Sequence, residues 1–131
     1  MNRPLTFKDP VFAIDCPDAP ALADFYALLL GWTITSPPDD TEWVEVHPPK
    51  GTGFGFALAF QQVDQYRAPE WPEGQVPQQA HLDFHVDSLE ESGELAVAAG
   101  AVRHEVQHSE SGSFVVYSDP AGHLFCLCQA Q

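Results

Sequence analysis

Basic residues are scarce in this chain of 131 residues. Five lysines and arginines stand against nineteen aspartates and glutamates, which gives a formal net charge of −14. Because such a surface repels phosphate backbones and anionic lipid, we expect no nucleic-acid partner and no membrane partner. The acidic residues are dispersed, which is typical of a solubilising surface. Long apolar runs are also missing, since none approaches the roughly 18 residues of a membrane span.

Cysteines are also few, and no secretory signal peptide is expected. The odd number of cysteines, three in all, predicts reduced thiols and therefore a cytoplasmic location. No apolar run follows Arg3, as it would in a secretory signal peptide. The glycine-rich stretch 51–55 is followed by neither a lysine nor a predicted helix, which excludes a phosphate-binding loop.

Two helices with well-marked ends are predicted. The first spans 18–32, where Asp18 can cap the free N–H groups and Gly31 can close the helix in a left-handed conformation. The second begins after Ser88, which has capping-box spacing to Glu91, and ends at Gly100. Strands are predicted at 10–17, 41–48, 53–63, 80–87, 101–108, 112–119 and 122–129.

The order of strand, helix, terminal glycine and further strands occurs twice. His81 lies 70 residues after Val11, and Gly100 lies 69 residues after Gly31. This near-constant offset predicts an internal duplication into two βαβββ halves. We expect one domain over 1–131, with module one at about 7–63, a proline-rich linker at 64–79 and module two at about 80–129.

The strand that opens module two has a polar face and an apolar face. Strict alternation places His81, Asp83 and His85 together on one side. The other side carries Leu82, Phe84 and Val86. If a helix covers the apolar side, the polar row faces a concave space between the halves, where ligand sites usually lie.

Three segments resemble the vicinal oxygen chelate superfamily, and most closely its glyoxalase-like domains. They are "DFYALLLGW", "HLDFHVDSLE" and "SDPAGHLFCLC", in that order, within a match of about 7–129. The resemblance implies an α+β fold in which two βαβββ modules form a cupped, partly open mixed β-barrel with the helices outside. It also implies a homodimer in many members.

The resemblance further implies a metal site in many relatives, with ligands from the first and last strands of each module. In this sequence those positions are approximately Val11, Phe60, His81 and Cys126. Only His81 and Cys126 can bind a cation, whereas a stable divalent site needs three or four protein ligands. We therefore expect no metal cofactor, the alternative being one Zn, Ni, Fe or Mn ion held by His81 and Cys126.

The polar row of His81, Asp83 and His85 is not favoured as a substitute set of metal ligands either. Alternate residues on a strand lie roughly 6.5–7 Å apart, which is far for side chains that must converge on one ion. We therefore expect His81, Asp83 and His85 to form a hydrated wall, with a catalytic acid–base role as the alternative.

The favoured function is binding of a small organic molecule in the barrel cleft, and whether the protein is an enzyme stays open. The residues expected to line the ligand are Val11, Trp43, Phe56, Phe60 and Tyr117. One alternative is a lyase, isomerase or dioxygenase of the superfamily that uses a metal at His81, or metal-free proton transfer by His81 or His85 with Asp83. Another is a non-catalytic, dimeric interaction domain.

Overall fold

Each half of the chain folds into a strand, a helix and three further strands. The computed structural model describes residues 3–131, with one unit ending at Val63 and the next beginning at Asp64. Unit 1 contains β1 (Val11–Cys16), α1 (Ala19–Leu30), β2 (Thr33–Ile34), β3 (Trp43–His47) and β4 (Ala57–Gln62). Unit 2 contains β5 (Leu82–Val86), α2 (Leu89–Ala99), β6 (Val102–Arg103), β7 (Phe114–Ser118) and β8 (Leu124–Gln129). The predicted α+β class and the two βαβββ modules are confirmed.

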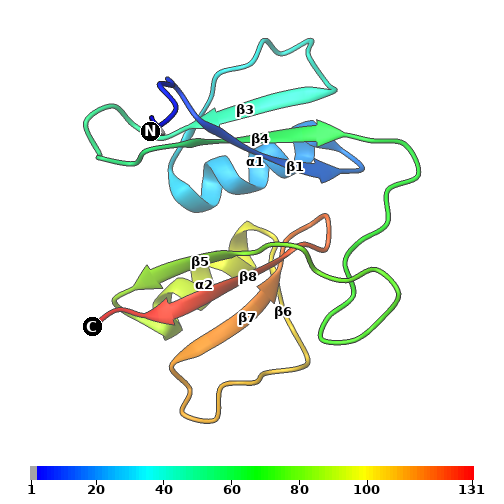
Figure 1. Ribbon diagram of the computed structural model, residues 1–131. Coiled ribbons are helices and arrows are strands. Elements are labelled where there is room, and N and C mark those ends of the chain that lie inside the picture. The colour runs from blue at the N-terminus through cyan, green and yellow to red at the C-terminus, as the bar shows by residue number, and fades with distance from the viewer. Residues whose placement is uncertain (1–2) are drawn as a thin grey trace. The chain divides into compact units, whose positions relative to one another are not determined.

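In both units the first and last strands are neighbours. The strand order is β1-β4-β3-β2 in unit 1 and β5-β8-β7-β6 in unit 2. The β1–β4 and β5–β8 pairs are parallel, whereas the other pairs are antiparallel. Each helix packs on its own sheet, α1 against β3 and β4 and α2 against β8 and β6 (Figure 1). The opposite face of each sheet carries a mixture of polar, small and apolar side chains, such as Asp83 and Cys126 in unit 2 and Trp43 in unit 1.

An aromatic stack lies in the core of each unit. In unit 1 Phe60 of β4 has no exposed surface, and its ring stacks on Tyr26 of α1 with centroids 5.3 Å apart. In unit 2 the rings of Tyr117 and Phe125 stack at 5.7 Å, and Phe84 meets Phe125 edge-on at 6.0 Å. Burying each such ring is worth about 1.5–3 kcal/mol, and each pair adds about 0.5–1.5 kcal/mol.

The predicted helix ends are confirmed. Asp18 accepts a hydrogen bond from the backbone N–H of Ala21 at 3.1 Å, and Gly31 takes the left-handed conformation at φ 70°. Ser88 accepts from the N–H of Glu91 at 3.2 Å. Over residues 3–131 neither helix is long and apolar enough to cross a membrane.

Three strands differ from the sequence expectation. β4 begins at Ala57 rather than near 53, because Gly53 has φ 83° and turns the chain away from an extended path. The strand expected at 101–108 is reduced to β6, since His104 accepts the N–H of Val106 on its Nδ1 atom and bends the chain. β2 has no counterpart among the predicted strands, because two residues are too few to show alternation.

The turn before β8 is built around a buried carboxylate. Asp119 is 4% exposed, and its Oδ1 atom accepts the N–H groups of Ala121 at 2.9 Å and His123 at 3.0 Å. Gly122 supplies a positive φ of 87° between them. The Asp-Pro-x-Gly pattern in the third resembling segment therefore reflects a turn that leads the chain into the central strand of the sheet.

The proline-rich segment 64–79 packs on unit 2. The ring of Trp71 lies 5.2 Å from that of His104 and 5.0 Å from that of His108. Within the segment, a carboxylate oxygen of Glu70 accepts two backbone N–H groups at 3.0 and 3.1 Å. Side-chain contacts thus order a stretch that has no helix or strand of its own.

Gly93→Ala should destabilise the protein, because a Cβ atom at this position of α2 would lie 2.4 Å from the hydroxyl oxygen of Tyr117. Overpacking costs about 1–3 kcal/mol, which exceeds the ~1 kcal/mol that alanine gains over glycine in a helix. We expect chemical denaturation to report a net loss of about 1 kcal/mol in the free energy of unfolding.

Tyr117→Phe removes that oxygen and leaves the nearest ring atom at 3.5 Å. In this background Gly93→Ala should therefore stabilise the protein. An equal loss in both backgrounds would mean that the close approach is not the cause.

Candidate functional site

Three side chains of β3 are linked along the sheet face opposite α1. Trp43 donates its indole N–H to Oε2 of Glu45 at 2.8 Å, and Oε1 of Glu45 lies 2.8 Å from Nε2 of His47. The hydrogen bond from Trp43, followed by that from His47, holds the pKa of Glu45 below its ordinary value. The ionised carboxylate therefore orients both rings. Of the three, only Trp43 was predicted from the sequence, although the alternation W-x-E-x-H places Glu45 and His47 on the same face of the strand.

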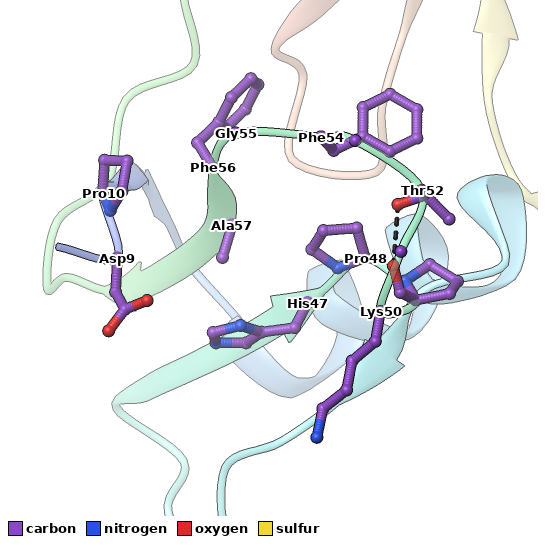
Figure 2. A pocket seen from close by; sticks show the side chains of 13 residues that line it. Asp9, Pro10, His47, Pro48, Lys50, Thr52, Phe54, Gly55, Phe56 and Ala57 are labelled. Atoms are coloured by element: carbon purple, nitrogen blue, oxygen red, sulfur yellow. Dashed lines mark hydrogen bonds between the residues drawn. The ribbon is translucent and has the colours of Figure 1, made fainter.

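A hollow of about 310 Å³ opens in unit 1 where β3 ends. His47, the loop at 48–56 and the residues just before β1 line it. Figure 2 shows the rings of Phe54 and Phe56 on one side of the loop and the side chain of Lys50 on the other. Phe54 is 60% exposed and Phe56 is 41% exposed. The lining of the hollow thus includes phenylalanine, histidine and lysine residues.

The predicted ligand-lining residues fall into two environments. Phe56 lines the hollow, Trp43 lies half-buried at the other end of the β3 row, and Val11 is 38% exposed on the same sheet face. Phe60 and Tyr117 lie instead on the helix-covered faces of their sheets, within the aromatic stacks. These two residues therefore belong to the core rather than to the open face where a ligand wall was expected.

The strand register also corrects one of the metal positions implied by the family. Ala13 pairs with Ala59 in unit 1 as Asp83 pairs with Cys126 in unit 2. Ala59, and not Phe60, therefore occupies the place that corresponds to Cys126. Since neither alanine, phenylalanine nor the valine at the β1 position carries a donor atom, unit 1 does not supply its half of a four-ligand site.

In unit 2, by contrast, three donor side chains meet on the open face of the sheet. His81, Asp83 and Cys126 each place one ligand atom within 4.8 Å of the other two. Nε2 of His81 lies 3.3 Å from Oδ1 of Asp83. The expectation that strand spacing keeps these two side chains apart is wrong, because both side chains lean along the strand and span the distance between their Cα atoms.

His85, the third residue of the predicted catalytic row, lies further along β5. It is exposed and pairs in register with Cys128, two residues further along the strands than the pair of Asp83 with Cys126. His85 is not one of the three clustered donors. The structure therefore brings together His81 and Asp83 and leaves His85 outside their group.

The environment of Cys126 disfavours its thiolate. Burial first, and then the negative charge of Asp83, raise the pKa of the Cys126 thiol from 9.0 to about 12. Because this thiol ionises more readily in the unfolded chain, its contribution to stability declines as the pH rises from 9 towards 12. Without a bound cation, Cys126 is thus a neutral thiol at physiological pH.

Alkylation of Cys126 by iodoacetamide should consequently be slow in the folded protein. In a Cys16→Ser/Cys128→Ser variant treated with chelator, the rate at pH 9 should be about a hundredfold lower than in urea, because only the thiolate reacts. Asp83→Asn should raise the folded-state rate. Equal rates in buffer and in urea would contradict the raised pKa.

Comparison with known proteins extends over nearly the whole chain. A family model described as "Glyoxalase-like domain" matches residues 11–128. No curated protein matches the chain in sequence. The antibiotic-binding protein TnmS3 from Streptomyces sp. CB03234 has a similar fold, with a TM-score of 0.62, 18% identity, and coverage of 98% of this chain and 100% of that one.

Two further solved structures are similar. One is a glyoxalase/bleomycin resistance protein/dioxygenase family enzyme from Burkholderia phytofirmans PsJN, with a TM-score of 0.67, 17% identity and coverage of 95% and 100% of the two chains. The other is a possible glyoxalase from Bacillus cereus, with a TM-score of 0.63, 14% identity and coverage of 94% and 99%. At these identities the likeness concerns the fold alone. Together with the family match, it places the chain in the glyoxalase-like domain family of the vicinal oxygen chelate superfamily.

Proposed function

We propose that the protein binds a small organic molecule at the hollow of unit 1, through an apolar ring or chain and a polar group. One observation carries the proposal: two exposed phenylalanines, Phe54 and Phe56, line the same hollow as His47. Covering an exposed phenyl ring is worth about 1.5–3 kcal/mol. The hydrogen bond to Glu45 fixes the His47 ring, so a polar ligand group meets an oriented partner.

The size of the hollow and the family both support this proposal. A volume of about 310 Å³ lies at the lower end of the range of about 300–1,000 Å³ found for small-molecule sites. A protein of similar fold, TnmS3, is an antibiotic-binding protein. The binding that we propose requires no metal ion, because rings, an imidazole and backbone groups supply all of the contacts.

A thermal-shift screen of small aromatic and amphipathic compounds should yield ligands that raise the melting temperature of the wild-type protein. Phe56→Ala should weaken binding of such a ligand by about tenfold or more, because the lost ring contact is worth at least ~1.4 kcal/mol. Glu45→Gln should weaken the binding of ligands that carry a polar group and leave the affinity for purely apolar ligands unchanged. Isothermal titration calorimetry gives the affinities.

Leu28→Ala is the matched control, since Leu28 is an exposed apolar residue of the same unit on α1. It should leave ligand affinity unchanged. A broad library that produces no shift, or ligands that bind equally to Phe56→Ala, would refute the proposal.

A second candidate function is proton transfer by His81 assisted by Asp83, as in an isomerase or lyase. The contact of 3.3 Å between His81 Nε2 and Asp83 Oδ1 favours it, because a carboxylate beside an imidazole orients the ring for proton transfer. Both side chains are about half exposed, with 40% and 46% of their surface accessible, so a substrate can approach them.

This candidate predicts exchange of C–H protons for deuterium in a panel of hydroxy- and oxo-carbonyl compounds, followed by NMR in D₂O. His81→Gln and Asp83→Asn should each slow the exchange by about 10²–10⁴-fold, while His108→Gln, on another segment, should not. Exchange that persists in His81→Gln would eliminate His81 as the base.

The proposal also includes a homodimer in the cytoplasm. The dimer is proposed from the family resemblance, which implies a homodimer in many members. The compartment is supported by the cysteines, since Cys16, Cys126 and Cys128 form no disulfide within residues 3–131, as is usual under reducing conditions.

A further inference from the structure

Three chemically different metal-binding side chains meet on one rigid surface of unit 2. Asp83 and Cys126 are direct partners in the parallel β5–β8 ladder, and His81 immediately precedes β5 on the same face. β8 is itself held between β5 and β7. Ligands on neighbouring strands of a sheet are placed more reproducibly than ligands on loops.

The distances suit a single ion. Ligand atoms about 2.0–2.3 Å from a tetrahedral zinc ion lie about 3.3–3.8 Å from one another. The imidazole nitrogen of His81 and the carboxylate oxygen of Asp83 are already 3.3 Å apart, and the sulfur of Cys126 completes a group that fits within 4.8 Å. Small side-chain rotations therefore suffice to bring all three atoms to one centre.

The donor set also selects the kind of ion. A thiolate prefers zinc, cadmium and other thiophilic cations over magnesium, calcium and manganese, and an imidazole suits zinc well. Carboxylate and thiolate together carry two negative charges, which match a divalent cation. Three protein ligands leave the fourth tetrahedral position open, as in zinc sites that bind water or a substrate.

We propose that His81, Asp83 and Cys126 form a three-ligand site for a thiophilic divalent cation of the zinc class, contained entirely within unit 2. The site differs from the four-position arrangement implied by the family, because Asp83 stands in for the donors that unit 1 lacks. It shares no residue with the proposed ligand hollow, whose residues all belong to unit 1. The fourth position is open to water or to an oxygen, nitrogen or sulfur atom of a ligand.

Cadmium titration of the full chain tests this site directly. Protein purified without nickel affinity and stripped with chelator should develop a thiolate-to-cadmium charge-transfer band that saturates at about one ion per chain, and zinc should compete for it. Cys126→Ser should abolish the band. Asp83→Asn and His81→Gln should weaken cadmium affinity by at least about tenfold.

Two control variants separate this site from nonspecific binding. Cys128→Ser retains Cys126 and removes the neighbouring thiol, and His108→Gln removes an imidazole of the same unit; both should keep the band and the affinity. Asp83→Asn preserves the shape of a half-exposed side chain, so it tests the site even if Cys126→Ser lowers stability.

The proposal is overturned by a band that survives in Cys126→Ser, by Cys128→Ser losing binding as fully as Cys126→Ser, or by unchanged affinity in Asp83→Asn. It is overturned too if magnesium or calcium competes as well as zinc. Compound binding at the unit 1 hollow should be unaffected by Asp83→Asn, so failure of one proposal is distinguishable from failure of the other.

Discussion

The parallel pairing of the first and last strands in each unit decides which face of the sheet each side chain of these strands occupies. In unit 1 this register places Phe60 on the helix side and Ala59 on the open side. A slip of one residue would exchange the faces and expose the ring that stacks on Tyr26. The aromatic stack therefore locks the register, and the register in turn determines which side chains are left on the open face. In unit 2 the edge-on contact between Phe84 of β5 and Phe125 of β8 lies across the corresponding pair of strands.

The two units share this framework but differ in the chemistry of their open faces. Where unit 2 pairs Asp83 with Cys126, unit 1 pairs two alanines. Unit 1 instead carries its polar groups on β3, where Glu45 links Trp43 and His47. A duplicated sheet can diverge in this manner because substitutions on the open face leave the helix-covered core undisturbed. The cation site that we propose thus lies on the first and last strands of its module. The ligand hollow lies instead at the end of β3 and along the loop that follows it.

Much of the fold could be predicted from the sequence, because it depends on local signals. Capping residues such as Asp18 and Ser88, and the regular offset between the halves, are visible without knowledge of tertiary contacts. The short strands and the loop at 48–56 were less accessible, since glycine conformation and side-chain hydrogen bonds override apolar alternation there.

The candidate sites were only partly predictable, for two physical reasons. The faces of β4 follow from its pairing with β1, so placing Phe60 correctly on the helix-covered face required a register that single-strand patterns do not contain. The meeting of His81 with Asp83 depends on side-chain reach rather than backbone spacing. The hollow depends on the path of a loop, which explains why Phe56 was identified from its aromatic character while His47 was missed.

The bond between Glu45 and His47 has a consequence for the chemistry of a ligand. An ionised carboxylate can only accept a hydrogen bond, so Nε2 of His47 must carry the hydrogen atom that is donated to Glu45. In the neutral imidazole that tautomer leaves Nδ1 with a lone pair. A hydroxyl or ammonium group of a ligand can therefore donate a hydrogen bond to this Nδ1 atom, whereas a carbonyl or carboxylate oxygen, which only accepts, gains no hydrogen bond from it.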